Sequence, residues 1–346
     1  MSKQTRRIAR PTLMDVARHA GVSRATASLV VRKSPLVSRE TRASVEAAMA
    51  EIGYVYNAGA AGMRAARSRT IGVIIPNLSN PFFGILLTGI DHVVEGAGLA
   101  TFIAQSAESQ EKQDGFVTRM REHGVDGLIV CPAAGTKADF TQKLQMWGMP
   151  VVEVLRTVGG EADYVGMDQF GGMYGAVSRL VDLGHVRIGF VTANLDHSAR
   201  EERLSAFRAA IARYHAVDAV EMTIEPTHGE ATALALRMAR QKGAPSAWIC
   251  HNDVIGLGMH RGFCEAGLVP GRDVSLIGYD NVAETELVRP ALASVATEAV
   301  EIGQLAASQL LRRIENPDAP RQRMTVPSHF VDRGSVGPRA FDPLEG

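Results

Sequence analysis

Four residues near the start of the chain could read DNA, because Arg24, Ala25, Ser28 and Leu29 lie on two successive turns of one short helical pattern. Ser23, directly before them, is a good helix N-cap. Arg24 can donate two hydrogen bonds to guanine, which is worth roughly 1–3 kcal/mol of base discrimination. Ala25 or Leu29 can contact the methyl group of thymine. For Leu29, packing against a neighbouring helix is an equally good interpretation.

The segment before Ser23 predicts a first helix, because its apolar residues recur at i, i+3, i+4 and i+7. Thr12 can cap this helix and Gly21 can end it. Two short helices joined by a glycine-containing turn are typical of a helix-turn-helix motif. The second helix of that motif enters the major groove with its N-terminal residues at the base edges. Ser38 and Gly53 bound a third predicted helix.

Hydroxyl groups around these helices are suited to the DNA backbone, where contacts fix the register and carry no sequence information directly. Ser23 and Ser38 also fit a pure capping role, and the two roles are compatible. The candidates for backbone contact are Thr12, Ser23, Thr26, Ser28, Ser38 and Thr41.

The charge distribution favours a polyanion-binding head on an acidic body. Residues 1–70 contain 13 Lys and Arg against 4 Asp and Glu, whereas the whole chain has 37 of each. The positive excess of the head is therefore balanced by an equal negative excess in the rest of the chain. A solvated basic tail is the alternative to a nucleic-acid-binding head.

The body of the chain predicts parallel sheets covered by helices on both faces, because strand-like segments alternate with amphipathic ones of 10–17 residues. So many strands favour two lobes over one sheet. No dinucleotide, Walker A or nucleophile-elbow motif is present. The predicted strands are residues 71–75, 100–104, 127–131, 151–155, 163–167, 187–191, 220–224, 247–250 and 274–278.

Polar or stacking residues follow several of these strands, at the sheet edge where open α/β folds bind ligands. Alternatives apply to single residues: Asn80 could be only a helix cap, Phe83 only core, and Asp280 only a turn residue. Together they predict a polar cleft. The candidates are Asn80, Phe82, Phe83, Arg156, Arg203, Asn252 and Asp280.

The segments TLMDVARHAGVSRATAS and VSRETRASVEAAMAEIGYVYN resemble the head of the lactose/galactose repressor (LacI) family. The resemblance implies that Arg24, Ala25 and Leu29 occupy base-reading positions. It also implies that the linker NAGAAGMRAARSRT becomes a helix in the minor groove. There Met63 is the wedge between base pairs, and Asn57 and Arg64 contact the groove or backbone. A disordered basic linker is the alternative.

The segments IGVIIPNLSNPFF, HNDVIGLG and DVSLIGYDN resemble the periplasmic-binding-protein-like effector domain of the same family. The resemblance implies that the seven cleft candidates named above line an effector site between two lobes. The expected domains are a helix-turn-helix head at 1–56, a hinge at 57–70 and an effector and dimerisation domain at 71–346. Its lobes are expected at 71–168 with 297–326, and at 169–296 with 327–341.

Two departures from the family bear on the ligand. Leu155 stands where sugar-binding relatives often carry Asp, and Thr297 replaces a frequent Gln. Without an Asp neighbour, Arg156 and Arg203 suit a carboxylate or phosphate, so a sugar acid is one hypothesis. Asp280 favours hydroxyl groups, and a sugar, a sugar acid or a derivative all stay open.

The expected function is that of a DNA-binding transcriptional repressor, which reads a palindromic operator as a homodimer and is switched by a small sugar-like effector. Whether the effector releases the repressor or acts as a corepressor is open. We expect no catalysis, cofactor, metal or membrane span. The three cysteines form no framework, and the N-terminus lacks a signal peptide, so the cytoplasm is the expected location.

Two other classes of protein compete with this interpretation. A solute-binding protein for transport would need an export signal and no basic head. A sugar enzyme on an α/β fold would need an acid/base pair or a phosphate loop, and the sequence shows neither.

Overall fold

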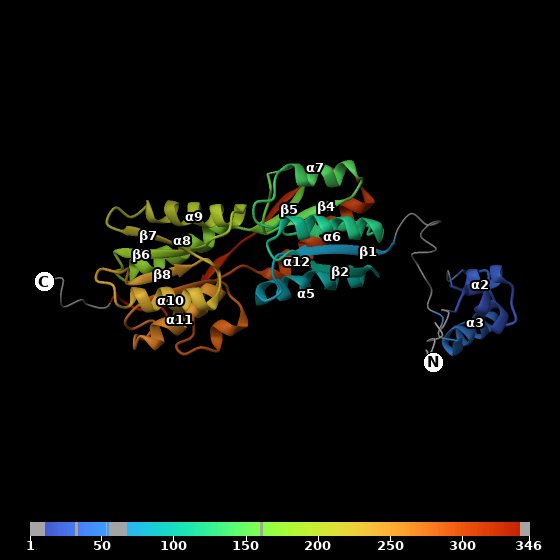
Figure 1. Cartoon of the computed structure of the whole chain (residues 1–346), viewed down its shortest axis with the longest axis horizontal. Coiled ribbons are helices and arrows are strands. Elements are labelled where there is room, and N and C mark those ends of the chain that lie inside the picture. The colour runs from blue at the N-terminus through green and yellow to red at the C-terminus, as the bar shows by residue number, and fades with distance from the viewer. Residues whose placement is uncertain (1–10, 32–33, 53, 55–67, 160–161, 340–346) are drawn as a thin grey trace, which may run out of the picture. The chain divides into compact units, whose positions relative to one another are not determined.

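The computed structural model describes residues 11–31, 34–52, 54, 68–159 and 162–339. They belong to two compact units, Met1–Ser68 and Arg69–Gly346 (Figure 1). None of the helices in these described ranges is long and apolar enough to cross a membrane.

The first unit is a three-helix head, as the sequence predicts. Thr12 caps the first helix in a capping box with Asp15, which satisfies two backbone donors at once. Gly21, with φ +66°, makes the turn to the second helix, and this left-handed conformation favours glycine. The helices are α1 (Leu13–His19), α2 (Arg24–Val31) and α3 (Arg39–Ile52).

The head has a small core of its own. Each of the three helices contributes at least one buried side chain, and Ala17 of α1 and Ala27 of α2 are among them. Such small residues allow the helices to cross closely. The buried members are Val16, Ala17, Ala27, Val30, Val45 and Ala48.

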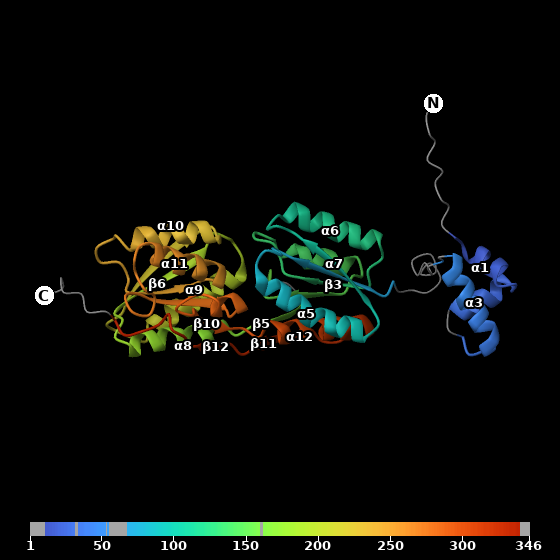
Figure 2. The same ribbon diagram turned by 90° about the horizontal axis from the view of Figure 1, so that it is seen from below.

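The first lobe of the second unit is built on a parallel sheet of six strands in the order β11-β5-β4-β3-β1-β2. Helices α5 (Pro81–Gly96) and α12 (Ala299–Glu315) cover one face, and α6 (Gln110–Glu122) and α7 (Asp139–Met146) cover the other (Figure 2). The strands are β1 (Thr70–Ile75), β2 (Ala100–Gln105), β3 (Gly127–Val130), β4 (Val151–Val154), β5 (Asp163–Met167) and β11 (Arg323–Val326).

The second lobe has the same plan, with strand order β12-β10-β9-β8-β6-β7 and a single antiparallel pair, β10 with β12. Helices α8 (Gln169–Asp182) and α9 (Ser198–Ile211) cover one face, and α10 (His228–Met238) and α11 (Asp253–Glu265) cover the other. The strands are β6 (Arg187–Ala193), β7 (Asp218–Ile224), β8 (Ala247–Cys250), β9 (Ser275–Asp280), β10 (Ala293–Ala296) and β12 (His329–Val331).

The chain passes between the lobes three times: from β5 to α8, from β10 to α12, and from β11 to β12. One buried apolar cluster extends from the α5–α12 face of the first sheet to the α8–α9 face of the second. The carboxyl ends of strands from both sheets therefore supply the loops at the junction between the lobes.

Helices α5 and α12 pack in backbone contact because glycines face each other between them. A Cβ added to Gly89 would lie 2.1 Å from the Val300 carbonyl oxygen, and one added to Gly303 would lie 2.3 Å from the Leu86 carbonyl oxygen. This close packing holds α12 against α5. Within the described residues, α12 is the one helix that the first lobe gains after the chain returns from the second lobe.

All nine strands expected from the sequence are present, with bounds that shift by at most two residues. Strands β10, β11 and β12 were not predicted. They have three or four residues each and lie next to the crossovers, so they lack the length that makes a strand pattern visible.

A buried ion pair anchors α12 to the first sheet. Asp163 is fully buried at the start of β5 and Arg313 lies on α12. The Arg313 guanidinium donates to both carboxylate oxygens, at 2.8 and 3.2 Å, and also to the carbonyls of Pro317 and Ala319. The Gln322 N–H donates to the same carboxylate at 2.8 Å. One carboxylate thus holds the strand, the helix and the segment that leads to β11.

We expect Asp163→Ala to lower the free energy of unfolding by about 3–5 kcal/mol, because it leaves a buried guanidinium without its partner. Urea denaturation measures the loss. The matched control is Asp332→Ala, which breaks an exposed pair with Arg179 and should cost at most about 1 kcal/mol. Equal losses for the two variants would contradict the anchoring role.

Candidate functional site

The face of α2 that the sequence predicts to read bases is exposed in the head. Arg24 and Ala25 are exposed, and Ser28 is half-buried. Leu29 is 37% exposed and lies outside the apolar core, which Ala27 and Val30 of the same helix fill instead. The packing alternative for Leu29 therefore has no support within the described head.

The capping role predicted for two serines is confirmed. Ser23 Oγ accepts from the Thr26 N–H at 3.0 Å, and Ser38 Oγ accepts from the Thr41 N–H at 3.2 Å. Thr12 Oγ1 accepts from the Asp15 N–H at 3.3 Å. Five of the six hydroxyls predicted to contact phosphates thus lie at the starts of the three helices, and Ser28 lies in the middle of α2. Asn57, Met63 and Arg64, predicted for the minor groove, lie outside the described residues.

Strained backbone marks the junction between the lobes. Six of the seven non-glycine residues with positive φ in the described chain follow or end strands at the carboxyl edges of the two sheets. Such conformations cost of order 1–3 kcal/mol each and cluster at ligand sites. They are Ala107, Glu108, Leu155, Asp280, Asn281 and Glu298.

Arg156 has a carboxylate partner that the sequence did not predict. Its guanidinium donates to both oxygens of Glu108 at 2.9 Å, and to the Pro132 carbonyl at 3.0 Å. Glu108 also accepts from the Ala134 N–H at 2.9 Å. The premise that Arg156 lacks a carboxylate neighbour is wrong, because Glu108 arrives from the loop after β2, 48 residues earlier in the chain.

Arg203 and Asp280 form the polar centre of the second lobe. The Arg203 guanidinium lies 3.8 Å from Asp280 Oδ1 and 4.0 Å from the centre of the Tyr279 ring. It also donates to the Gln169 side chain at 3.0 Å and to the His251 carbonyl. Arg203 therefore has a carboxyl group beside it as well, supplied by Asp280 at the end of β9.

Asn80 joins this centre from the first lobe. Its Oδ1 caps α5 by accepting from the Phe82 N–H at 3.1 Å. Its side chain also lies close enough to Asp280 to lower the pKa of that carboxyl. The cap role and the cleft position therefore hold together, and the effect of Asn80 on Asp280 depends on the separation of the two lobes.

The remaining predicted cleft residues have structural roles. Phe82 and Phe83 are 3% and 7% exposed and pack edge to face with a centroid distance of 5.6 Å. Asn252 caps α11 by accepting from the Ile255 N–H at 3.0 Å. Both phenylalanines belong to the core cluster that crosses the lobes, so the structure supports the core alternative stated for Phe83.

Unpartnered polar atoms gather around this junction. Among the described residues, eight buried side-chain nitrogen or oxygen atoms lack a hydrogen-bond partner. Five of them belong to residues that end or follow strands near the cleft: Gln169, Thr192, His197, His251 and Thr297. Buried polar atoms are normally paired, so this concentration indicates a place for a hydrogen-bonding ligand.

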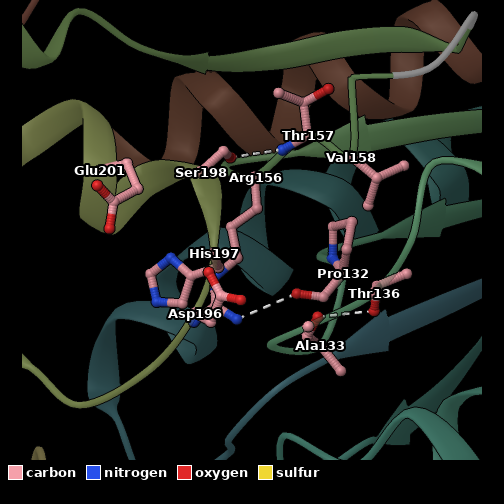
Figure 3. Close-up of a pocket in the computed structure, with 11 residues that line it drawn as sticks. Pro132, Ala133, Thr136, Arg156, Thr157, Val158, Asp196, His197, Ser198 and Glu201 are labelled. Carbon is pink, nitrogen blue, oxygen red and sulfur yellow. Dashed lines mark hydrogen bonds between the residues drawn. The ribbon is translucent and has the colours of Figure 1, made fainter.

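A pocket of about 260 Å³ has walls from both lobes and is lined by one of these residues, His197 (Figure 3). Two hydrogen bonds cross its rim: the Gly135 N–H donates to the Asp196 carbonyl at 2.7 Å, and the Thr157 N–H donates to Ser198 Oγ at 2.9 Å. Of the seven predicted cleft residues, only Arg156 lines this pocket. Three further residues at the start of α9, next to the predicted Arg203, were not predicted: His197, Ser198 and Glu201.

Two buried carboxyl groups in the second lobe hold their protons more tightly than usual. Burial raises the pKa of Asp280 to about 7, although Arg203 and Asn80 oppose the rise. Burial and the charge of Asp280 raise the pKa of Asp253 well above its ordinary value, although Ser294 and the Val282 N–H donate to it. The Arg203–Asp280 contact therefore depends on pH in the neutral range.

Comparison with known proteins matches both units. Residues 12–57 match the model "Bacterial regulatory proteins, lacI family", and residues 177–336 match the model "Periplasmic binding protein-like domain". The HTH-type transcriptional repressor PurR of Vibrio atlanticus is 28% identical over 336 residues, covering 94% of this chain and 98% of that protein. The ribose operon repressor of Escherichia coli is 28% identical over 331 residues, covering 94% and 99%.

Among solved structures, a lac repressor dimer bound to operator and the anti-inducer ONPF has a TM-score of 0.83 at 25% identity, covering 94% of this chain and 99% of that one. A helix-turn-helix head and a two-lobed ligand-binding body together define a transcriptional regulator. The head therefore contains a DNA-binding domain of the lacI family, and the body contains a periplasmic-binding-protein-like domain.

The raised pKa of Asp280 gives a testable pH dependence. Between about pH 4 and pH 7 the unfolded chain has lost this proton and the folded protein retains it, so the free energy of unfolding falls as the pH rises. Asp280→Asn removes this loss. Urea denaturation between pH 4.5 and 7.5 should therefore show that the free energy of unfolding of the variant rises relative to that of the wild type as the pH rises. Parallel profiles would contradict the raised pKa; Asp318→Asn, at an exposed position, is the control and should run parallel.

Proposed function

We propose that the protein represses transcription by binding a palindromic operator as a homodimer, under the control of a small hydroxylated ligand held between its two lobes. The observation that carries the proposal is the convergence of buried polar groups from both lobes on Arg203 and Asp280, in a chain that also has a helix-turn-helix head. A transport protein has no use for such a head, which counts against the solute-binding alternative.

Arg24, Ala25 and Leu29 are the proposed base-reading residues. The support is that all three are exposed on the first two turns of α2, which is the helix that enters the major groove in this motif. Thr12, Ser23, Thr26, Ser28, Ser38 and Thr41 are the proposed backbone contacts, and Asn57, Met63 and Arg64 the proposed minor-groove contacts.

The proposed boundaries are a head at 1–56, a hinge at 57–70 and an effector domain at 71–346. Within the last, the lobes are 71–168 with 297–326, and 169–296 with 327–341. The proposed effector residues are Asn80, Phe82, Phe83, Arg156, Arg203, Asn252 and Asp280; among them, Phe82, Phe83 and Asn252 would shape the walls through packing and capping. Because the proposed partner is chromosomal DNA, the cytoplasm is the proposed location.

Control by the ligand would work through the contacts that cross the lobes. A ligand that binds between Asn80 and Asp280, or beside Ser198, favours one separation of the lobes over another. A differential affinity of this kind is what shifts a conformational equilibrium. Either sign of the effect, release from DNA or tighter binding, is compatible with these contacts.

Self-association is proposed to use the β2 edge of the first sheet. β2 has no neighbour on its outer side in the sheet order, and Phe102 and Ile103 on it are 42% and 46% exposed. An exposed apolar edge strand promotes pairing with another chain unless it is covered. A second copy of the chain would cover it.

The base-reading proposal is tested by two substitutions on α2, each followed by selection of operators from random DNA. Arg24→Ala should relax the preference at one base pair in each half-site by about 5–150-fold, because it removes a bidentate contact. Leu29→Arg should change which base is preferred one helical turn away from the Arg24 contact.

Leu36→Arg is the matched control for Leu29→Arg, because it adds the same charge at an 84%-exposed position outside the three helices. It should strengthen binding and its salt dependence without changing the selected sequence. If Leu29→Arg also leaves the selected sequence unchanged, Leu29 does not face the bases.

A truncated chain that starts at Arg69 tests the division of labour between the units. It should lose operator binding and keep the thermal stabilisation by ligand that the full chain shows, because a ligand that binds only the folded state raises the melting temperature. Specific operator binding by the truncated chain would overturn the proposed role of the head.

A further inference from the structure

His197, directly before α9, has a ring nitrogen that is prepared to donate a hydrogen bond. Its Nδ1 accepts from the Arg200 N–H at 3.1 Å, which is the N-cap contact of the helix. A nitrogen that accepts carries no hydrogen, so in the neutral ring the proton is on Nε2. Nε2 is buried and has no partner among the described residues.

The ring of His197 stays neutral at every physiological pH. Burial lowers its pKa to about 2, and the positive charges of Arg156, Arg203 and Arg200 act in the same direction. The tautomer is therefore set by geometry and does not change with conditions. His197 lines the pocket between the lobes, on the side of the second lobe (Figure 3).

A second unpartnered nitrogen lies close to His197. The ring of His251 is 5.9 Å away between centroids, and the residue is only 6% exposed. Its Nδ1 is buried without a partner, and burial lowers its pKa well below the ordinary value. Leaving a buried polar atom unpaired is costly, so two of them on neighbouring rings, one of which lines the pocket, indicate groups that serve a ligand.

The charges of two of the arginines around these rings are already compensated. Glu108 accepts from Nη1 and Nη2 of Arg156, and Glu201 forms an ion pair with Arg200. A carboxylate or phosphate on the ligand would have to displace Glu108, which would leave that carboxylate partly buried and unpaired. This arrangement disfavours an anionic ligand.

We propose that His197 is a specificity-determining residue of the cleft: its Nε2–H donates a hydrogen bond to an uncharged oxygen of a hydroxylated ligand, and the paired arginines exclude the corresponding acid. The inference rests on the proposed ligand-binding function and assigns a chemical class to the ligand. It replaces the sugar-acid hypothesis that the sequence suggested.

Two substitutions separate the donor role of His197 from its capping role. His197→Asn retains an acceptor near the position of Nδ1, and Asn is a favoured N-cap, but it has no group at the position of Nε2. His197→Gln places an amide N–H near the position of Nε2 and is a poor cap. His197→Asn should therefore keep the stability of the wild type and lose ligand affinity. His197→Gln should lose stability and keep more of the ligand affinity.

The probes are four neutral sugars, each paired with its aldonic acid: ribose, glucose, galactose and cellobiose against ribonate, gluconate, galactonate and cellobionate. Thermal shift of the full chain at pH 7 identifies the binders, and calorimetry gives their affinities. We expect at least one sugar to stabilise the protein more than its acid does. His197→Asn should lower the affinity for that sugar by about 5–100-fold at unchanged stability, and His197→Gln should lower the affinity less.

Three outcomes would overturn the inference: an acid that binds as tightly as its sugar, a panel in which no neutral sugar stabilises the protein, or a His197→Asn variant that binds the sugar like the wild type. A ¹⁵N NMR spectrum is an independent check. The His197 ring should show the Nε2–H tautomer unchanged from pH 5 to pH 8, and a titration near pH 6.5 would contradict the assignment.

Operator selection with the wild-type chain separates this inference from the proposed function. If the wild type selects no specific DNA, the proposed function fails whatever the sugars do. If it selects an operator and the sugar tests fail, only the role of His197 and the uncharged class of ligand are wrong.

Discussion

The placement of charged groups inside the junction between two lobes is the constraint on which the rest of the structure depends. Arg203 and Asp280 are almost completely buried there, 3.8 Å apart. Taking charges out of water is costly unless each is paired and hydrogen-bonded. The Gln169 side chain and the His251 carbonyl accept hydrogen bonds from Arg203, and the Met167 sulfur of the first lobe lies 3.6 Å from its guanidinium. The surroundings of the pair therefore include groups from both lobes.

The same principle governs the first lobe and defines the chemistry of the pocket. Glu108 compensates Arg156, so the pocket wall offers paired charges and neutral donors in place of free cations. Neutral histidines and threonine hydroxyls without partners then provide the unused hydrogen-bonding capacity. A site of this kind selects a ligand by the positions of its hydroxyl groups, because each unmatched polar atom carries a cost.

The sequence predicted the elements well and the partners poorly. The starts of the three head helices, at Thr12, Ser23 and Ser38, follow from local capping chemistry. The nine predicted strands follow from local apolar patterns. The Glu108–Arg156 pair joins residues 48 positions apart, and no local pattern encodes it. The sequence named Arg203 and Asp280 as cleft candidates, and the structure brings them within 3.8 Å of each other. Polar residues at strand ends did not distinguish cleft residues from caps such as Asn252, because both occur at the same turn.

The central claim is that a ligand between the lobes controls binding of DNA by the head. The most direct measurement is the dissociation constant of the full chain for its selected operator, with and without a saturating concentration of a sugar that stabilises the protein. The account predicts a change of about 5–150-fold, in either direction, because that range corresponds to an ordinary coupling free energy. An unchanged dissociation constant at saturating ligand would contradict it.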